Sequence, residues 1–188
     1  MVSKSRLIFI FALAFLKWDA AYCGNDLSVQ IARDHVDVTV GFVGDSVEVF
    51  GDRRDPDTIV AIVVEGPEKD ITLWKRARVL GAWINRHYVQ FKDVPSYYHY
   101  AVSTDNLDNI PSEILNDYAL GHDALFNNIE IEKSRKVEDK KKFEEMLLDK
   151  KRSNDIFFEE PASFMFLNDN FFRVSFPIPP SAPTGEYK

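Results

Sequence analysis

The sequence predicts a mainly β protein, an immunoglobulin-like β-sandwich with a helical insertion at about residues 106–155. Short apolar stretches recur between turn signals about every eight to twelve residues, which is the spacing typical of a sandwich. Fifteen Phe and seven Tyr among 188 residues also favour strands. Hydrophobic residues make up 45% and charged residues 28%, so the chain has a globular composition and can bury a core.

The chain begins with a pattern typical of a secretory signal peptide. Two basic residues precede an unbroken apolar run of ten, Leu7 to Leu16, and Ala21-Tyr22-Cys23 offers small residues before a cleavage site. Such a run is too short to cross a hydrocarbon core of about 30 Å. We therefore interpret residues 1–23 as a signal peptide and residues 24–188 as the exported domain. An uncleaved N-terminal anchor is the alternative.

Cysteine content and net charge exclude several classes of protein. Cys23 is the single cysteine, so cleavage after it leaves no disulfide, zinc–thiolate site or cysteine nucleophile. The formal net charge is −7, whereas a nucleic-acid-binding domain usually carries a basic surplus. We expect no nucleic acid among the partners.

The first half of the domain reads as a series of strands. The run Ile59–Val64 is β-branched and continuous, which predicts a central strand covered on both faces. Val60, Ile62 and Val64 then share one face, and the residues between them share the other. Residues 51–57 form a polar turn. The expected strands lie at 36–40, 47–49, 59–64, 71–73, 82–84, 89–91 and 97–102.

The helical insertion is predicted from residues 111–152. Pro111 suits an early helix position, and Gly121 is expected to end the helix that begins at Pro111. One further helical turn is expected at residues 122–126. Residues 130–152 alternate basic and acidic side chains around a narrow apolar stripe, which predicts a surface helix. Ser134 is its expected N-cap, and the stripe consists of Phe143, Met146, Leu147 and Val137.

Strand patterns return near the C-terminus. Phe164–Phe166 and Phe171–Phe176 flank a turn at Asn168–Asn170, which predicts a hairpin. Residues 177–185 are rich in proline and extended, and Glu186–Lys188 resembles the start of another strand. We therefore expect that the sandwich is incomplete at this end and that further strands follow.

Six stretches together resemble a known family. They are, in order, Val40–Gly44, Glu65–Glu68, Gly81–Asn85, Phe91–Tyr97, Gly121–Asp123 and Phe176–Tyr187. In order and spacing they are similar to an uncharacterised family of alphaproteobacterial transmembrane proteins, over about residues 25–188.

The resemblance implies an architecture but no activity. Members of the family look like an exported β domain followed by two more strands and a C-terminal transmembrane helix, which this chain does not reach. That architecture implies the periplasmic face of the inner membrane as the location and an inner-membrane protein as partner. Some members are encoded beside proteins similar to sulfite exporters.

Catalytic, cofactor and metal sites are not predicted. The histidines have no metal-ligand spacing, and no serine stands on a nucleophile elbow, Ser46 being the nearest glycine-flanked one. His99, within Tyr97–Tyr100, is expected between packed aromatic rings rather than as a proton carrier. Several acidic or amide residues are interpreted as ordinary turn or surface residues and not as metal ligands or catalytic groups. They are Asp52, Asp55, Asp57, Asn168–Asn170, Glu159 and Glu160.

Each of two residue clusters has two interpretations, as a binding surface or as a purely structural feature. Trp74, Trp83 and the Tyr97–Tyr100 segment suit an interface, but core packing is the favoured interpretation. The basic groups Lys140–Lys142 and Lys150–Arg152 suit anionic headgroups, but interleaved acids favour a solvated helix face.

The functional prediction is therefore a non-catalytic, periplasm-facing interaction or accessory domain of a membrane-tethered protein. Two alternatives remain open: an accessory subunit of a membrane transporter, with a sulfur oxyanion as cargo, and an enzyme of unrecognised type.

Overall fold

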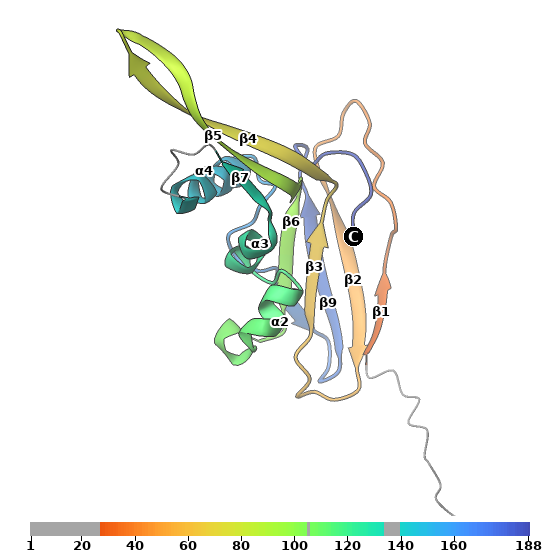
Figure 1. Ribbon diagram of the computed structural model, residues 1–188. Helices are drawn as coiled ribbons and strands as arrows, with labels where there is room; N and C mark the ends of the chain where they lie inside the picture. The colour runs from red at the N-terminus through yellow and green to blue at the C-terminus, as the bar shows by residue number, and fades with distance from the viewer. Residues whose placement is uncertain (1–26, 105, 134–139) are drawn as a thin grey trace, which may run out of the picture.

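The computed structural model describes residues 27–104, 106–133 and 140–188 (Figure 1). The expected signal peptide (residues 1–23), Ser134 and Val137 lie outside the described residues. The described chain is mainly β, with three antiparallel sheets, as the sequence predicts.

The first sheet has four strands in the order β1-β2-β9-β8. They are β1 (Leu27–Ile31), β2 (Asp45–Arg53), β9 (Phe171–Ile178) and β8 (Phe164–Phe166). The expected strand at 47–49 and the expected C-terminal hairpin are confirmed. Apolar and polar residues alternate along β9, so that Phe172, Val174 and Phe176 are fully buried.

The expected strand at 36–40 is wrong. These residues form an exposed loop between β1 and β2, where Val38 is 54% exposed and Val40 entirely so. The alternation of valines is present, but β2 already pairs with β1 on one side and β9 on the other. Alternation alone does not make a strand: the segment must also pair with a neighbour, and residues 36–40 pair with none of the described strands.

The second sheet consists of β3 (Ala61–Glu65) and β6 (Tyr98–Val102). The expected division of residues 59–64 between two faces is confirmed for the residues that pack in a core. Val60, Ile62 and Val64 pack on one side, and Val63 packs on the other. The expected central position is wrong: β6 is the one named strand that pairs with β3. At the other edge, Glu65 exchanges two backbone hydrogen bonds of 2.8 and 2.9 Å with Lys188.

The third sheet is a long hairpin with one short added strand. β4 (Glu68–Val79) pairs with β5 (Ala82–Pro95), and β7 (Ile131–Lys133) pairs with the inner part of β5. The two short strands expected at 82–84 and 89–91 are therefore one strand. The outer half of the hairpin extends away from the rest of the molecule (Figure 1).

Four helical segments lie between β6 and β8 in the sequence, which confirms the insertion. They are the 3-10 turn η2 (Leu107–Asn109), α2 (Ser112–Asp117), α3 (His122–Asn128) and α4 (Lys140–Arg152). The strand β7, in the same stretch, is not expected from the sequence. Phe143 and Leu147 of the apolar stripe are buried, whereas Met146 is exposed. None of the helices among the described residues is sufficiently long and apolar to cross a bilayer.

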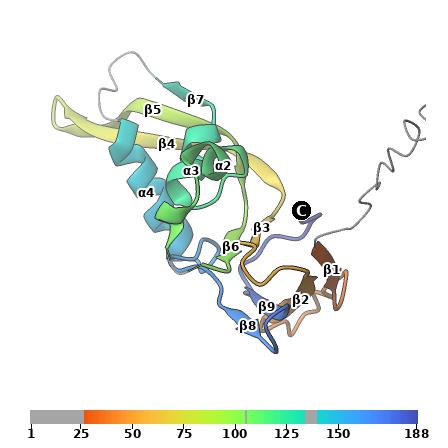
Figure 2. The same cartoon turned by 90° about the horizontal axis from the view of Figure 1, so that it is seen from below.

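Two hydrophobic cores meet at β6, which lies between them (Figure 2). The sheet-side core packs the first sheet against the second and consists of Val49, Val60, Ala101, Ala162, Phe172, Val174 and Phe176. The helix-side core packs the other face of β6 and the inner hairpin against the helices, with Phe91, Tyr98, Leu125, Phe143, Leu147 and Phe157 among its members. All five residues of β6 are buried because both faces are covered.

Candidate functional site

His99, which is buried, and His122, which is half-buried, both bind one segment, residues 156–162, which we call the strap. The strap follows α4 and runs parallel to β6, with Tyr98 donating its N–H to Ile156 and Ala162 donating to Tyr100. Nε2 of His122 lies 2.7 Å from the Phe158 carbonyl oxygen, and Nε2 of His99 lies 3.3 Å from that of Glu160. Because a carbonyl can only accept, both imidazoles carry their proton on Nε2.

Aromatic rings surround both imidazoles. His99 stacks on Phe158 with 4.1 Å between ring centroids, on the face of β6 opposite Tyr98 and Tyr100. His122 lies among Tyr98, Tyr100 and Phe157. The expected packing of His99 between aromatic rings is thus confirmed, whereas the parallel role of His122 was not expected.

Burial favours the neutral form of both histidines. It lowers the pKa of His99 to about 4, with the neighbouring His122 as a smaller contribution. Burial also lowers the pKa of His122. In the described part of the chain neither Nδ1 atom has a hydrogen-bond partner, so a second proton would be left without an acceptor. The arrangement suits a structural clamp on the strap.

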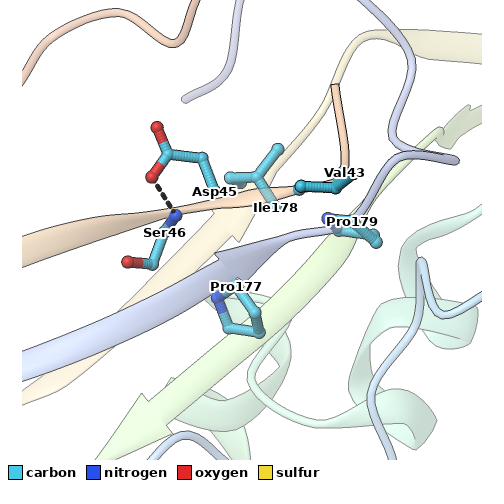
Figure 3. Close-up of a pocket in the computed structure, with 7 residues that line it drawn as sticks. Val43, Asp45, Ser46, Pro177, Ile178 and Pro179 are labelled. Carbon is cyan, nitrogen blue, oxygen red and sulfur yellow. Dashed lines mark hydrogen bonds between the residues drawn. The ribbon is translucent and has the colours of Figure 1, made fainter. Parts of the chain in front are cut away.

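A cavity of about 440 Å³ lies between the start of β2 and the end of β9, and Ser46 is in its wall (Figure 3). The Asp45 carboxylate accepts from the Ser46 backbone N–H at 2.7 Å and from Arg33 at 2.9 Å. These bonds lower the pKa of Asp45. No histidine is among the lining residues, so the Ser46 hydroxyl has no base beside it there.

A second cavity, of about 420 Å³, lies between the inner hairpin and α3. Its ionisable lining groups are Glu65, Glu68, Asp93, Glu130 and Lys92. Burial raises the pKa of Glu65. Glu68 binds the Lys188 ammonium at 2.6 Å, and Lys92 binds Asp70 at 3.3 Å. Within residues 27–104, 106–133 and 140–188, no cluster of three potential metal ligands forms.

Several acidic and amide residues have the structural roles that the sequence favours, but the polar turn expected at residues 51–57 begins later: Asp52 lies in β2, paired with Phe171. Asn168 accepts from the backbone N–H groups of Asn170 and Phe171, which closes the β8–β9 turn. Asp55 accepts from the N–H of Asp57 in the turn after β2. Glu159 is exposed and pairs with Arg152 at 3.7 Å.

The basic cluster of α4 is not wholly solvated. Lys151 is 8% exposed, and its Nζ donates to the carbonyls of Pro95 and Ser96 at 3.1 and 3.5 Å. The ammonium also lies 5.0 Å from the centre of the Phe157 ring. Burial lowers the pKa of Lys151 to about 8. This lysine therefore anchors the end of α4, while Lys141 and Lys150 stay exposed as expected.

The aromatic cluster divides into a core part and an exposed part. Tyr97, Tyr98 and Tyr100 are buried, as the favoured interpretation expects. For the tryptophans, the interpretation as core packing is wrong, because Trp74 is 49% exposed and Trp83 is 68% exposed. Both lie on the outer half of the β4–β5 hairpin, which we call the finger and define as residues 74–88.

The finger has an amphipathic, basic surface. Leu80 at its turn is entirely exposed and Ile84 is 44% exposed. Its sequence contains four Lys or Arg residues and neither Asp nor Glu, although the whole chain has a net charge of −7. The inner hairpin, in contrast, is fixed by Val89 and Phe91, which are fully buried in the helix-side core. Sequence reasoning missed the finger because it divided β5 into two strands.

Comparison with known proteins gives one match. A family model described as "Putative transmembrane protein (Alph_Pro_TM)" matches residues 26–188. Neither the curated proteins nor the solved structures yielded a match.

Proposed function

The chain belongs to the family described as putative transmembrane proteins, and we propose that its β domain is a non-catalytic interaction domain of a membrane-tethered protein. The observation that carries the proposal is the finger, an exposed apolar and basic element that extends from a well-packed body (Figure 1). Exposed tryptophans are costly in water, and aromatic residues are enriched where surfaces bind.

The histidines and cavities support a binding role over a catalytic one. His99 and His122 bind carbonyls of the strap, and neither is among the residues that line the two cavities. A general base must lie within hydrogen-bond reach of the proton that it takes from the substrate. Neither cavity brings together a nucleophile, a base and an orienting group.

Location and architecture complete the proposal. The basic and apolar residues of the N-terminal 23 support export, and the location that we propose for the domain is the periplasmic face of the inner membrane. The shared core between the first and second sheets supports an immunoglobulin-like sandwich as the body of the domain.

Shortening the finger tests the proposal. Residues 76–86 are replaced by Asn-Gly, which joins Lys75 to His87, a pair that already lies side by side. We expect a free energy of unfolding within about 1 kcal/mol of the unmodified protein, because the buried part of the hairpin is retained. Co-sedimentation with envelopes that lack the protein should show that the shortened protein binds them more weakly than the unmodified protein, whether the partner there is a protein or a lipid. Unchanged binding to the envelopes contradicts the proposal.

A further inference from the structure

The side-chain chemistry and the shape of the finger indicate what kind of partner it binds. Resting on the proposed function, we propose that the finger inserts its tip into the interface of an anionic phospholipid bilayer.

The distribution of apolar side chains over the finger carries the inference. Paired residues of two antiparallel strands point to the same face. One face therefore bears the pairs Ala77–Ile84 and Val79–Ala82, and the other bears Arg78–Trp83 and Trp74–Tyr88. Leu80 adds an exposed apolar group at the turn. A folded protein partner covers one face of a hairpin, whereas a bilayer surrounds both faces and the tip.

The basic side chains lie where headgroups would meet them. Arg78 is opposite Trp83, one pair behind the tip, and Arg76 and Lys75 follow toward the body. Tryptophan prefers the headgroup region of a membrane, and arginine extends its charge to the phosphates while its stem stays apolar. An anionic surface attracts each such residue.

The turn of the finger does not carry the residues that would stabilise it best, which favours a role in binding. Val79 pairs with Ala82, so the loop has two residues, Leu80 and Gly81, with φ of 50° and 89°. Positive φ at both residues favours Asn-Gly, and leucine is strained at the first position. An exposed leucine there serves neither the fold nor solubility, but it provides an apolar tip.

The test follows Trp83 in the full chain bound to vesicles. Trp18→Phe and Trp74→Phe leave Trp83 as the sole tryptophan, so its fluorescence reports the finger and not the apolar N-terminal segment. We expect a blue shift, and quenching by brominated lipids, with vesicles of phosphatidylcholine and phosphatidylglycerol. Added salt should weaken both signals. Trp83 that stays water-exposed and unquenched overturns the inference.

Charge variants compare the finger with a matched surface. In the same background, Arg76→Gln with Arg78→Gln should lower the affinity reported by Trp83 about tenfold or more. Lys141→Gln with Lys150→Gln removes the same charge from exposed positions of α4 and should change it little. Equal losses in the two double variants contradict insertion by the finger.

Leu80→Asn separates binding from folding. We expect a higher thermal midpoint, because Asn-Gly suits the turn, together with a several-fold weaker affinity for the anionic vesicles. Unchanged affinity overturns the role of the tip. Lipid-free self-association that depends on Trp83 indicates a second copy as the occupant and also overturns it. If shortening the finger weakens binding to envelopes while lipid vesicles leave the fluorescence of Trp83 unaffected, the proposed function stands and this inference fails.

Discussion

At the scale of single residues, the first sheet depends on one close contact between β2 and β9. Gly51 is paired with Phe172, whose ring lies over it. A Cβ atom at Gly51 would be 2.2 Å from Cζ of Phe172, and that ring is fully buried in the sheet-side core. The glycine is therefore required by the space that the ring occupies.

Replacing Gly51 by alanine should destabilise the protein by about 1–3 kcal/mol, because the Phe172 ring must move within a packed core. Urea unfolding measures the loss. Gly41→Ala is the matched control, since no atom lies within 4 Å of a Cβ there, and its stability should be unchanged. Similar stabilities for the two variants would show that the ring has room to shift.

At the scale of elements, the strap substitutes for a regular strand beside β6. It makes backbone bonds to β6 at its two ends, and between them His99 and His122 bind the carbonyls of Glu160 and Phe158. Imidazoles thus satisfy backbone groups that a regular ladder would pair. Burial favours the neutral form of both imidazoles, and it outweighs the opposite effect that the bonds to the two carbonyls have on their pKa values.

Acid should therefore weaken the protein. The folded pKa of His99 is about 4, against 6.5 when unfolded, and the pKa of His122 is lowered too, so the unfolded chain binds protons first. The stabilisation is complete above about pH 6.5 and is lost as the pH falls from there toward the folded values. The loss is on the order of 3 kcal/mol for His99. Urea unfolding across this pH range measures it.

His99→Phe separates the two histidines. The variant keeps a ring against Phe158 but removes one titrating group, so the slope of stability against pH should fall by about one proton. His35→Gln is the control, because His35 is exposed and pairs with Asp34 outside the strap. If His99→Phe retains the full acid sensitivity, the clamp is not its source.

At the scale of the whole molecule, β6 joins the two cores into one unit. Its alternating side chains enter both, with Tyr98 and Tyr100 in the helix-side core and Ala101 in the sheet-side core. If β6 separates from one core, its other face also leaves the second core, so side chains of both cores become exposed to water. We therefore expect the described body to unfold cooperatively.

Leu147→Ala in the helix-side core should cost about 2–5 kcal/mol, and Val174→Ala in the sheet-side core somewhat less. Native-state hydrogen exchange measures the effect in each part. Each variant should lower the protection of the slowest amides in both β9 and α3 by the same amount. An effect confined to the substituted core would show that the two cores open independently.

The sequence by itself determined the local structure and the broad class of the protein. Alternation located β2, β9 and the faces of β3, turn residues located the β8–β9 hairpin, and Pro111 marked the start of α2. Gly121, expected to end that helix, instead precedes α3, because α2 already ends at Asp117. These features depend on neighbours within a few residues, so their signals are local. The six stretches also identified the family to which the chain belongs.

Only the tertiary structure decided which segments pair and which side chains are covered. Residues 36–40 alternate like a strand but pair with none of the described strands, and residues 82–95 form one strand because β4 runs beside them throughout. The same cause separates the buried tyrosines of β6 from the exposed Trp74 and Trp83. Burial depends on what packs from distant parts of the chain, and a local pattern does not contain that information.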